Sequence, residues 1–163
     1  MSSRLSPMFH LAPDRGRRVL VVANDAAGPE DVDLLLGGMP PGGDEVLVVA
    51  PALNSWSGRL VCDPGAAERD ACARLEATVR SLRASGAAAS GIVGDADPLY
   101  AIEDALSVFD ADEVVIATAP ARMDGWLGET LAARARAHCG VPVRNVAVAF
   151  ESPPVRGEPL VAA

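Results

Sequence analysis

Lysine is absent from this chain, and all 14 of its basic residues are arginine. No lysine is therefore available to form a Schiff base or to contact a phosphate group. Acidic residues outnumber basic ones, which gives a formal net charge of −8 and an isoelectric point near 4.7. Because such a surface repels nucleic-acid backbones and anionic membranes, we expect no nucleic acid and no membrane among the partners.

Cysteines and long apolar segments are also scarce. The three cysteines, Cys62, Cys72 and Cys139, are odd in number and lack metal-site spacing, which indicates reduced thiols inside a cell. The apolar run near the N-terminus is shorter than a signal-peptide core, and no segment is long enough to span a bilayer. The sequence therefore predicts a cytoplasmic protein.

Aromatic residues make up only 4% of the chain although half of it is hydrophobic. Valine, leucine, isoleucine and alanine must therefore fill the core. A length of 163 residues is typical of one domain. We expect residues 1–16 to form an N-terminal arm, residues 17–150 the folded domain, and residues 151–163 a proline-rich tail.

Short apolar runs alternate with helical patterns along the predicted domain. Continuous apolar runs are typical of parallel strands covered on both faces. The predicted strands span residues 19–23, 46–50, 88–93, 114–118 and 143–150. The predicted helices span residues 28–36, 67–84, 98–109 and 125–138, and residues 51–66 form a long loop. Such alternation predicts an α/β fold, with a five-stranded parallel sheet between two helical layers.

The segment from Gly91 to Thr118 is the most informative part of the chain. A short apolar strand ends at Gly94-Asp95, and Asp97 is placed to cap a helix that starts at Pro98. An aspartate before the helix accepts a hydrogen bond from a free amide of the first turn, and proline has no amide to leave unpaired there. The turn therefore lies at the carboxyl end of a strand, which is where ligands bind in open α/β sheets.

This segment resembles the region between the third and fourth strands of the universal stress protein family, in which a glycine and a helix precede a strand that starts with aspartate. The resemblance covers roughly residues 18–149. It implies the strand order 3-2-1-4-5, as in the wider adenine nucleotide alpha hydrolase-like group. It also implies a homodimer through the last strand, Val143 to Phe150. Strand alternation places Val146, Val148 and Phe150 on one face of that strand.

The carboxyl ends of strands one and four are expected to meet at one cleft. In nucleotide-binding members of the family an aspartate ends the first strand, and in this chain Asn24 occupies that place, with Asp25 next to it. The same residues are also ordinary turn and cap formers. The candidate ligand-binding residues are Asn24, Asp25, Pro51, Leu53, Asn54, Gly94, Asp95, Thr118, Arg122 and Thr130.

The loop after the fourth strand departs from the glycine motif of ATP-binding family members. Ala117 and Pro120 stand at the first two glycine places, Glu129 stands at the third, and only Thr130 matches. Proline has no amide to donate to a phosphate, and glutamate adds a like charge. We therefore expect no tight ATP binding, with Arg122 either gripping an anion or solvated as a loop arginine.

The chain shows no pattern that indicates catalysis. Asp95, Asp97, Glu103 and Asp104 form an acidic cluster, but cap formation and a solvated helix face explain them better than a metal does. The sequence therefore predicts a non-catalytic, stress-associated binding or regulatory module with no cofactor. One alternative is a small-ligand binder that holds ATP, ADP or AMP in the same cleft. A second is an unrecognised enzyme of the nucleotide alpha hydrolase-like group.

Overall fold

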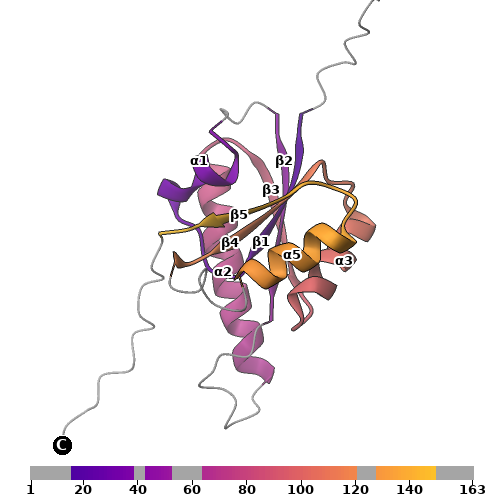
Figure 1. The fold of residues 1–163 in the computed structure, drawn as a ribbon. Coiled ribbons are helices and arrows are strands. Elements are labelled where there is room, and N and C mark those ends of the chain that lie inside the picture. The colour runs from indigo at the N-terminus through magenta and orange to yellow at the C-terminus, as the bar shows by residue number, and fades with distance from the viewer. Residues whose placement is uncertain (1–15, 39–42, 53–63, 121–127, 150–163) are drawn as a thin grey trace, which may run out of the picture.

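A computed structural model describes residues 16–38, 43–52, 64–120 and 128–149. They form a five-stranded parallel sheet with the order β3-β2-β1-β4-β5, and helices cover both faces (Figure 1). The predicted α/β class and strand order are confirmed. Among the described residues, no helix combines the length and apolar character needed to cross a bilayer.

The strands follow the apolar runs of the sequence closely. They are β1 (Arg18–Ala23), β2 (Glu45–Pro51), β3 (Ala88–Gly94), β4 (Glu113–Thr118) and β5 (Val143–Ala147). The central strand β1 pairs with β2 and β4, and its residues from Val19 onward are fully buried. Burial on both faces explains why β1 is apolar from Val19 onward rather than alternating.

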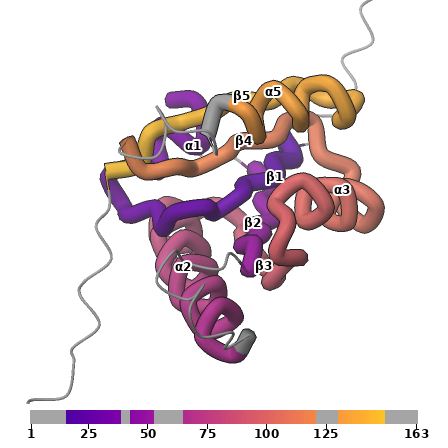
Figure 2. Tube along the Cα trace, turned by 60° about the horizontal axis from the view of Figure 1, so that its bottom comes forward, coloured from indigo at the N-terminus to yellow at the C-terminus, as the bar shows by residue number. Residues whose placement is uncertain are grey.

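Two helical layers sandwich the sheet. The helical segments are the 3₁₀ turn η1 (Pro29–Asp31), α1 (Val32–Leu35), α2 (Pro64–Ala84), α3 (Pro98–Val108) and α5 (Gly128–His138). The core on one face joins the sheet to α1 and α2, and the core on the other face joins it to α3 and α5. Figure 2 shows the two pairs of helices on opposite sides of the sheet.

The first helical segment is shorter and tighter than the helix expected over residues 28–36. It opens as the turn η1, and the four-residue helix α1 follows. Gly37 and Gly38 then adopt φ angles of 71° and 72°. Only glycine enters this left-handed region at little cost, so the pair ends the helix as the sequence predicts.

Two other predicted boundaries need correction. Helix α2 starts at Pro64 rather than at Ala67, because proline is tolerated in a first helical turn. Strand β5 ends at Ala147 rather than at Phe150, which lies outside the described residues. The buried carboxylate of Asp31 accepts a hydrogen bond from the amide of Ala149 at 2.8 Å. That bond draws the chain toward η1 after Val148, which donates to Thr118 O at 3.0 Å.

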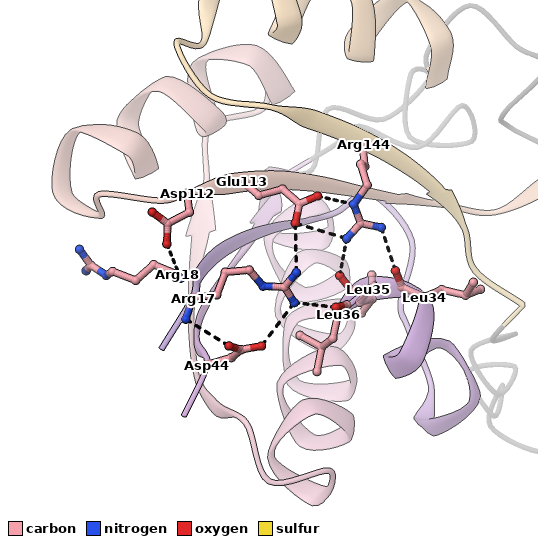
Figure 3. A network of polar contacts seen from close by, with 9 residues as sticks. All are labelled: Arg17, Arg18, Leu34, Leu35, Leu36, Asp44, Asp112, Glu113 and Arg144. Atoms are coloured by element: carbon pink, nitrogen blue, oxygen red, sulfur yellow. Dashed lines mark hydrogen bonds and ion pairs between the residues drawn. The ribbon is translucent and has the colours of Figure 1, made fainter. Parts of the chain in front are cut away.

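Two arginines hold the end of α1 against the amino edge of the sheet (Figure 3). Arg144 of β5 donates to Leu34 O at 3.1 Å and to Leu35 O at 2.9 Å. Arg17 donates to Leu36 O and pairs with Asp44. Both arginines also form ion pairs with Glu113 of β4. These contacts satisfy carbonyls that a helix terminus leaves without intrahelical partners.

Candidate functional site

The candidate site lies at the carboxyl edge of the sheet, between β1 and β4. The chain leaves β1 toward α1 and α2, whereas it leaves β4 toward α5 on the opposite face. Such a point, where the connections diverge to opposite faces, is the usual ligand crevice of an open α/β sheet. Ala23 and Ala117 are paired in register at the ends of the two strands. Asn24 and Thr118, which directly follow them, therefore lie next to each other.

Asn24 and Thr118 bring two buried oxygen atoms to this crevice. Their residues are 4% and 1% exposed. Neither Asn24 Oδ1 nor Thr118 Oγ1 has a hydrogen-bond partner among the described residues. A buried polar atom without a partner costs about 1–3 kcal/mol. A third such atom, Asn145 Oδ1, lies within β5. Most buried polar atoms in folded proteins are satisfied by protein, water or a bound group, so Asn24 and Thr118 are candidate ligand contacts at this edge.

Asp25 connects the end of β1 to the end of β4. Its amide donates to Ala117 O at 3.2 Å, and its Oδ2 accepts a hydrogen bond from the amide of Ala119 at 2.8 Å. The first main-chain donor after β4 therefore already faces a carboxylate of the same chain. The next residue, Pro120, is exposed and has no amide hydrogen to offer.

Arg74 of α2 is a site-bordering residue that the sequence did not reveal. Its Nη1 donates to Asn24 O and its Nη2 to Pro51 O, both at 2.6 Å. One turn later, Thr78 Oγ1 accepts the amide of Ala27 at 3.1 Å. The spacing of Arg74 and Thr78, four residues apart beside apolar neighbours, indicates a helix face at the border of the core. It does not indicate which carbonyls the guanidinium contacts, because these come from distant segments.

The ends of β2 and β3 form a separate, tightly packed corner. The amide of Ala52 lies 3.3 Å from both Gly94 O and Asp95 O. A Cβ atom on Gly94 would lie 2.6 Å from Ala101 Cβ and 2.8 Å from Val49 Cγ2. Since β2 separates β3 from β1, Gly94 and Asp95 line this corner rather than the crevice of Asn24 and Thr118.

The acidic residues after β3 shape the start of α3. Asp97 caps the helix as predicted, because its Oδ1 accepts the amide of Leu99 at 2.9 Å. Asp95 Oδ1 accepts the amide of Asp97 at 2.8 Å, which forms the preceding turn. In the described part of the chain, no group of three or more histidine, cysteine or acidic residues is arranged to hold a metal ion.

The remaining predicted site residues divide into two sets. Thr130 lies in the first turn of α5 and is half-buried. Leu53, Asn54 and Arg122 lie outside the described residues, so their place in the cleft stays a prediction. Neither terminal arm lies within the described residues.

The described histidine and one described cysteine lie at the far end of α5. That helix starts at the carboxyl edge, so His138 in its last turn and Cys139 after it lie at the amino edge. Burial, and secondarily the carboxylate of Glu103, raise the pKa of the Cys139 thiol. A raised pKa keeps this sulfur protonated at neutral pH, which makes it a poor nucleophile.

Comparisons with solved structures show what this architecture is similar to. A universal stress protein from Archaeoglobus fulgidus has a TM-score of 0.56 and 16% identity, over 79% of this chain and 92% of that one. A universal stress protein family protein from Arabidopsis thaliana with AMP bound has a TM-score of 0.54 and 17% identity, over 85% and 97%. A universal stress protein in complex with cAMP has a TM-score of 0.53 and 16% identity, over 81% and 97%.

Sequence comparisons add nothing to this likeness. No protein-family model matches the chain, and no curated protein is significantly similar to it in sequence. The solved structures therefore show that the chain has the universal stress protein fold.

Proposed function

We propose that this chain, which has the universal stress protein fold, is a non-catalytic module that binds a small molecule and serves a regulatory role. The observation that carries the proposal is that the buried side-chain oxygens of Asn24 and Thr118, where β1 and β4 end, have no partner among the described residues. Open α/β sheets generally bind ligands at this edge, and a ligand there would satisfy both atoms.

The absence of catalysis is part of the proposal. A nucleophilic mechanism needs a nucleophile within hydrogen-bond reach of a base. At the crevice, the carboxylate of Asp25 accepts the amide of Ala119, and His138 and Cys139 lie at the opposite edge of the sheet. No cofactor is required for a binding role, and the reduced thiols inferred from the sequence are consistent with a cytoplasmic protein.

Tight ATP binding is not expected. A triphosphate needs several converging amides or cations. After β4, Ala119 already donates to Asp25, Pro120 lacks a donor, and the chain contains no lysine to compensate. We therefore expect ATP to bind no tighter than roughly 0.1–1 mM.

An adenine nucleotide with one phosphate is the second candidate ligand. Two similar structures hold AMP and cAMP, and a monophosphate needs fewer anion contacts than ATP does. The adenosine part would then occupy the crevice beside Asn24 and Thr118.

Calorimetry with AMP, cAMP and Mg²⁺–ATP tests the proposal, together with native mass spectrometry of gently purified protein. We expect a carried small molecule or a monophosphate affinity at least about tenfold tighter than that for ATP. Thr118→Val should remove binding, because it deletes one of the two oxygens and keeps the side-chain shape. Thr78→Val, which changes a threonine outside the crevice, is the matched control. Low-micromolar ATP binding would overturn the predicted ligand preference, and turnover of ATP would overturn the non-catalytic role.

A further inference from the structure

We infer that Asp25 excludes phosphate from the crevice and that the bound molecule presents hydrogen-bond donors, and no negative charge, where it meets Asn24 and Thr118. This inference rests on the proposed function and names the chemistry of its ligand. Asp25 selects against anions, because its carboxylate lies where an anionic ligand would need a hydrogen-bond donor.

The contact between Asp25 and Ala119 is the first observation. In an anion site at the end of a strand, main-chain amides point at the negative group. The first such amide after β4 donates at 2.8 Å to Asp25 Oδ2. A phosphate at this position would have to displace a carboxylate of the protein and would meet its charge at short range. Pro120 supplies no replacement donor.

The two unpartnered oxygens are the second observation. Asn24 Oδ1 accepts hydrogen bonds and cannot donate them. A phosphate oxygen is itself an acceptor, so it cannot satisfy this atom. A hydroxyl or amide group can donate to Asn24 Oδ1. Thr118 Oγ1, on the neighbouring strand β4, can either accept from or donate to the same ligand. The chemistry therefore matches a group that carries hydrogen-bond donors and no negative charge, such as a hydroxyl or an amide.

One described cation at this edge, Arg74, takes part in holding the fold. Arg74 donates to the carbonyls of Asn24 and Pro51 from the α2 side. Its position explains how the chain packs α2 against the ends of β1 and β2. It also places the guanidinium on the side of β1 that faces β2, whereas Ala119 follows β4 on the other side.

A series of probes that differ only in phosphate number tests the inference. Adenosine, AMP and ATP are titrated calorimetrically into the full chain and into the Asp25→Asn variant, which retains an acceptor for Ala119 and removes the charge. In the unmodified chain, affinity should fall from adenosine to AMP to ATP. In Asp25→Asn, affinity for ATP should rise about tenfold while that for adenosine stays unchanged. Asp95→Asn is the matched control, because Asp95 also accepts a main-chain amide but lies at β3.

Each of the other possible outcomes also supports or contradicts the inference. Tighter binding of ATP than of adenosine by the unmodified chain would overturn the inference, whether or not the variant folds. An unchanged ratio of ATP to adenosine affinity in Asp25→Asn would do the same. If no nucleoside binds, the adenine candidate of the proposed function fails, and tripolyphosphate alone decides about Asp25. Tripolyphosphate added at low salt should then raise the Tm of Asp25→Asn more than that of the unmodified chain. Equal increases in Tm would contradict the inference.

Discussion

Thr118 and Thr78 are both buried, but their hydroxyl groups are in opposite situations. Thr78 Oγ1 accepts the amide of Ala27 and donates to Arg74 O at 2.9 Å. Thr118 Oγ1 has no partner among the described residues. The first hydroxyl therefore holds the segment between β1 and η1 against α2, while the second costs free energy in the ligand-free protein. A residue kept at a cost to stability is typical of a binding position.

Replacing each threonine by valine should separate these roles. Thr78→Val leaves the buried amide of Ala27 without an acceptor, so the free energy of unfolding should fall by about 1–3 kcal/mol. Thr118→Val removes an unpartnered group, so stability should stay within about 0.5 kcal/mol of the original or rise. Urea unfolding of the ligand-free protein measures both. A loss above about 1 kcal/mol in Thr118→Val would show that its hydroxyl is satisfied.

Gly94 is required for packing rather than for a special backbone angle. A methyl group there would lie 2.6 Å from Ala101 Cβ, so Gly94→Ala should push α3 away from β3. We expect a loss of about 1–3 kcal/mol in the free energy of unfolding. Gly140→Ala is the matched control, because a Cβ on Gly140 meets nothing within 4 Å. Equal stability of the two variants would contradict this packing account.

At the level of elements, α1 is too short to be stable by itself. Isolated helices below about 12–15 residues are marginal in water, and α1 has four residues. Arg17 and Arg144 supply donors to its last carbonyls, and Glu113 holds both guanidinium groups. The helix therefore depends on contacts from β5 and β4, which are remote in sequence.

Arg144→Lys should weaken this arrangement. A lysine ammonium cannot match the planar fork that reaches Leu34 O, Leu35 O and Glu113 together. We expect a loss of about 1–2 kcal/mol and faster hydrogen exchange at the amides of α1. Arg80→Lys, on the exposed surface of α2, should change neither quantity. Unchanged exchange in Arg144→Lys would mean that α1 is held by its apolar contacts instead.

At the level of the whole molecule, β3 and β5 are the edge strands of the sheet. An uncovered strand edge invites pairing with another chain. Val148 is only 1% exposed and packs in the core with Val32, so it is not available to a partner as strand alternation suggested. A dimer through β5 would therefore rely on the strand edge itself and on exposed residues such as Ala147.

The homodimer through Val143 to Phe150 stays a prediction. Light scattering at micromolar concentration should give the mass of a dimer. Ala147→Glu should shift it to the monomer, because the two charges would face each other across a two-fold interface. The control is Ala88→Glu, since Ala88 is exposed on the opposite edge strand β3. Dissociation by Ala88→Glu alone would move the interface to β3, and a monomeric unmodified chain would contradict the prediction.

Local chemistry made most of the fold predictable from the sequence. The apolar run Val19–Ala23 indicates a strand covered on both faces, and the order of Asp97 and Pro98 indicates the start of a helix. Both depend on neighbouring residues, so both were correct. The strand order was predicted from the family resemblance, and the structure confirms that order.

Only the tertiary structure decided how the candidate site is built. The contacts of Asp25 with Ala119, of Arg74 with Asn24 O, and of Asp31 with Ala149 join residues separated by 94, 50 and 118 positions. Which donor meets which acceptor over such separations depends on strand order and helix placement, not on local pattern. The sequence by itself determined the strands and predicted that a ligand site lies where β1 and β4 end. Packing determined that the carboxylate of Asp25 accepts the first amide after β4, and that the side-chain oxygens of Asn24 and Thr118 lack partners among the described residues.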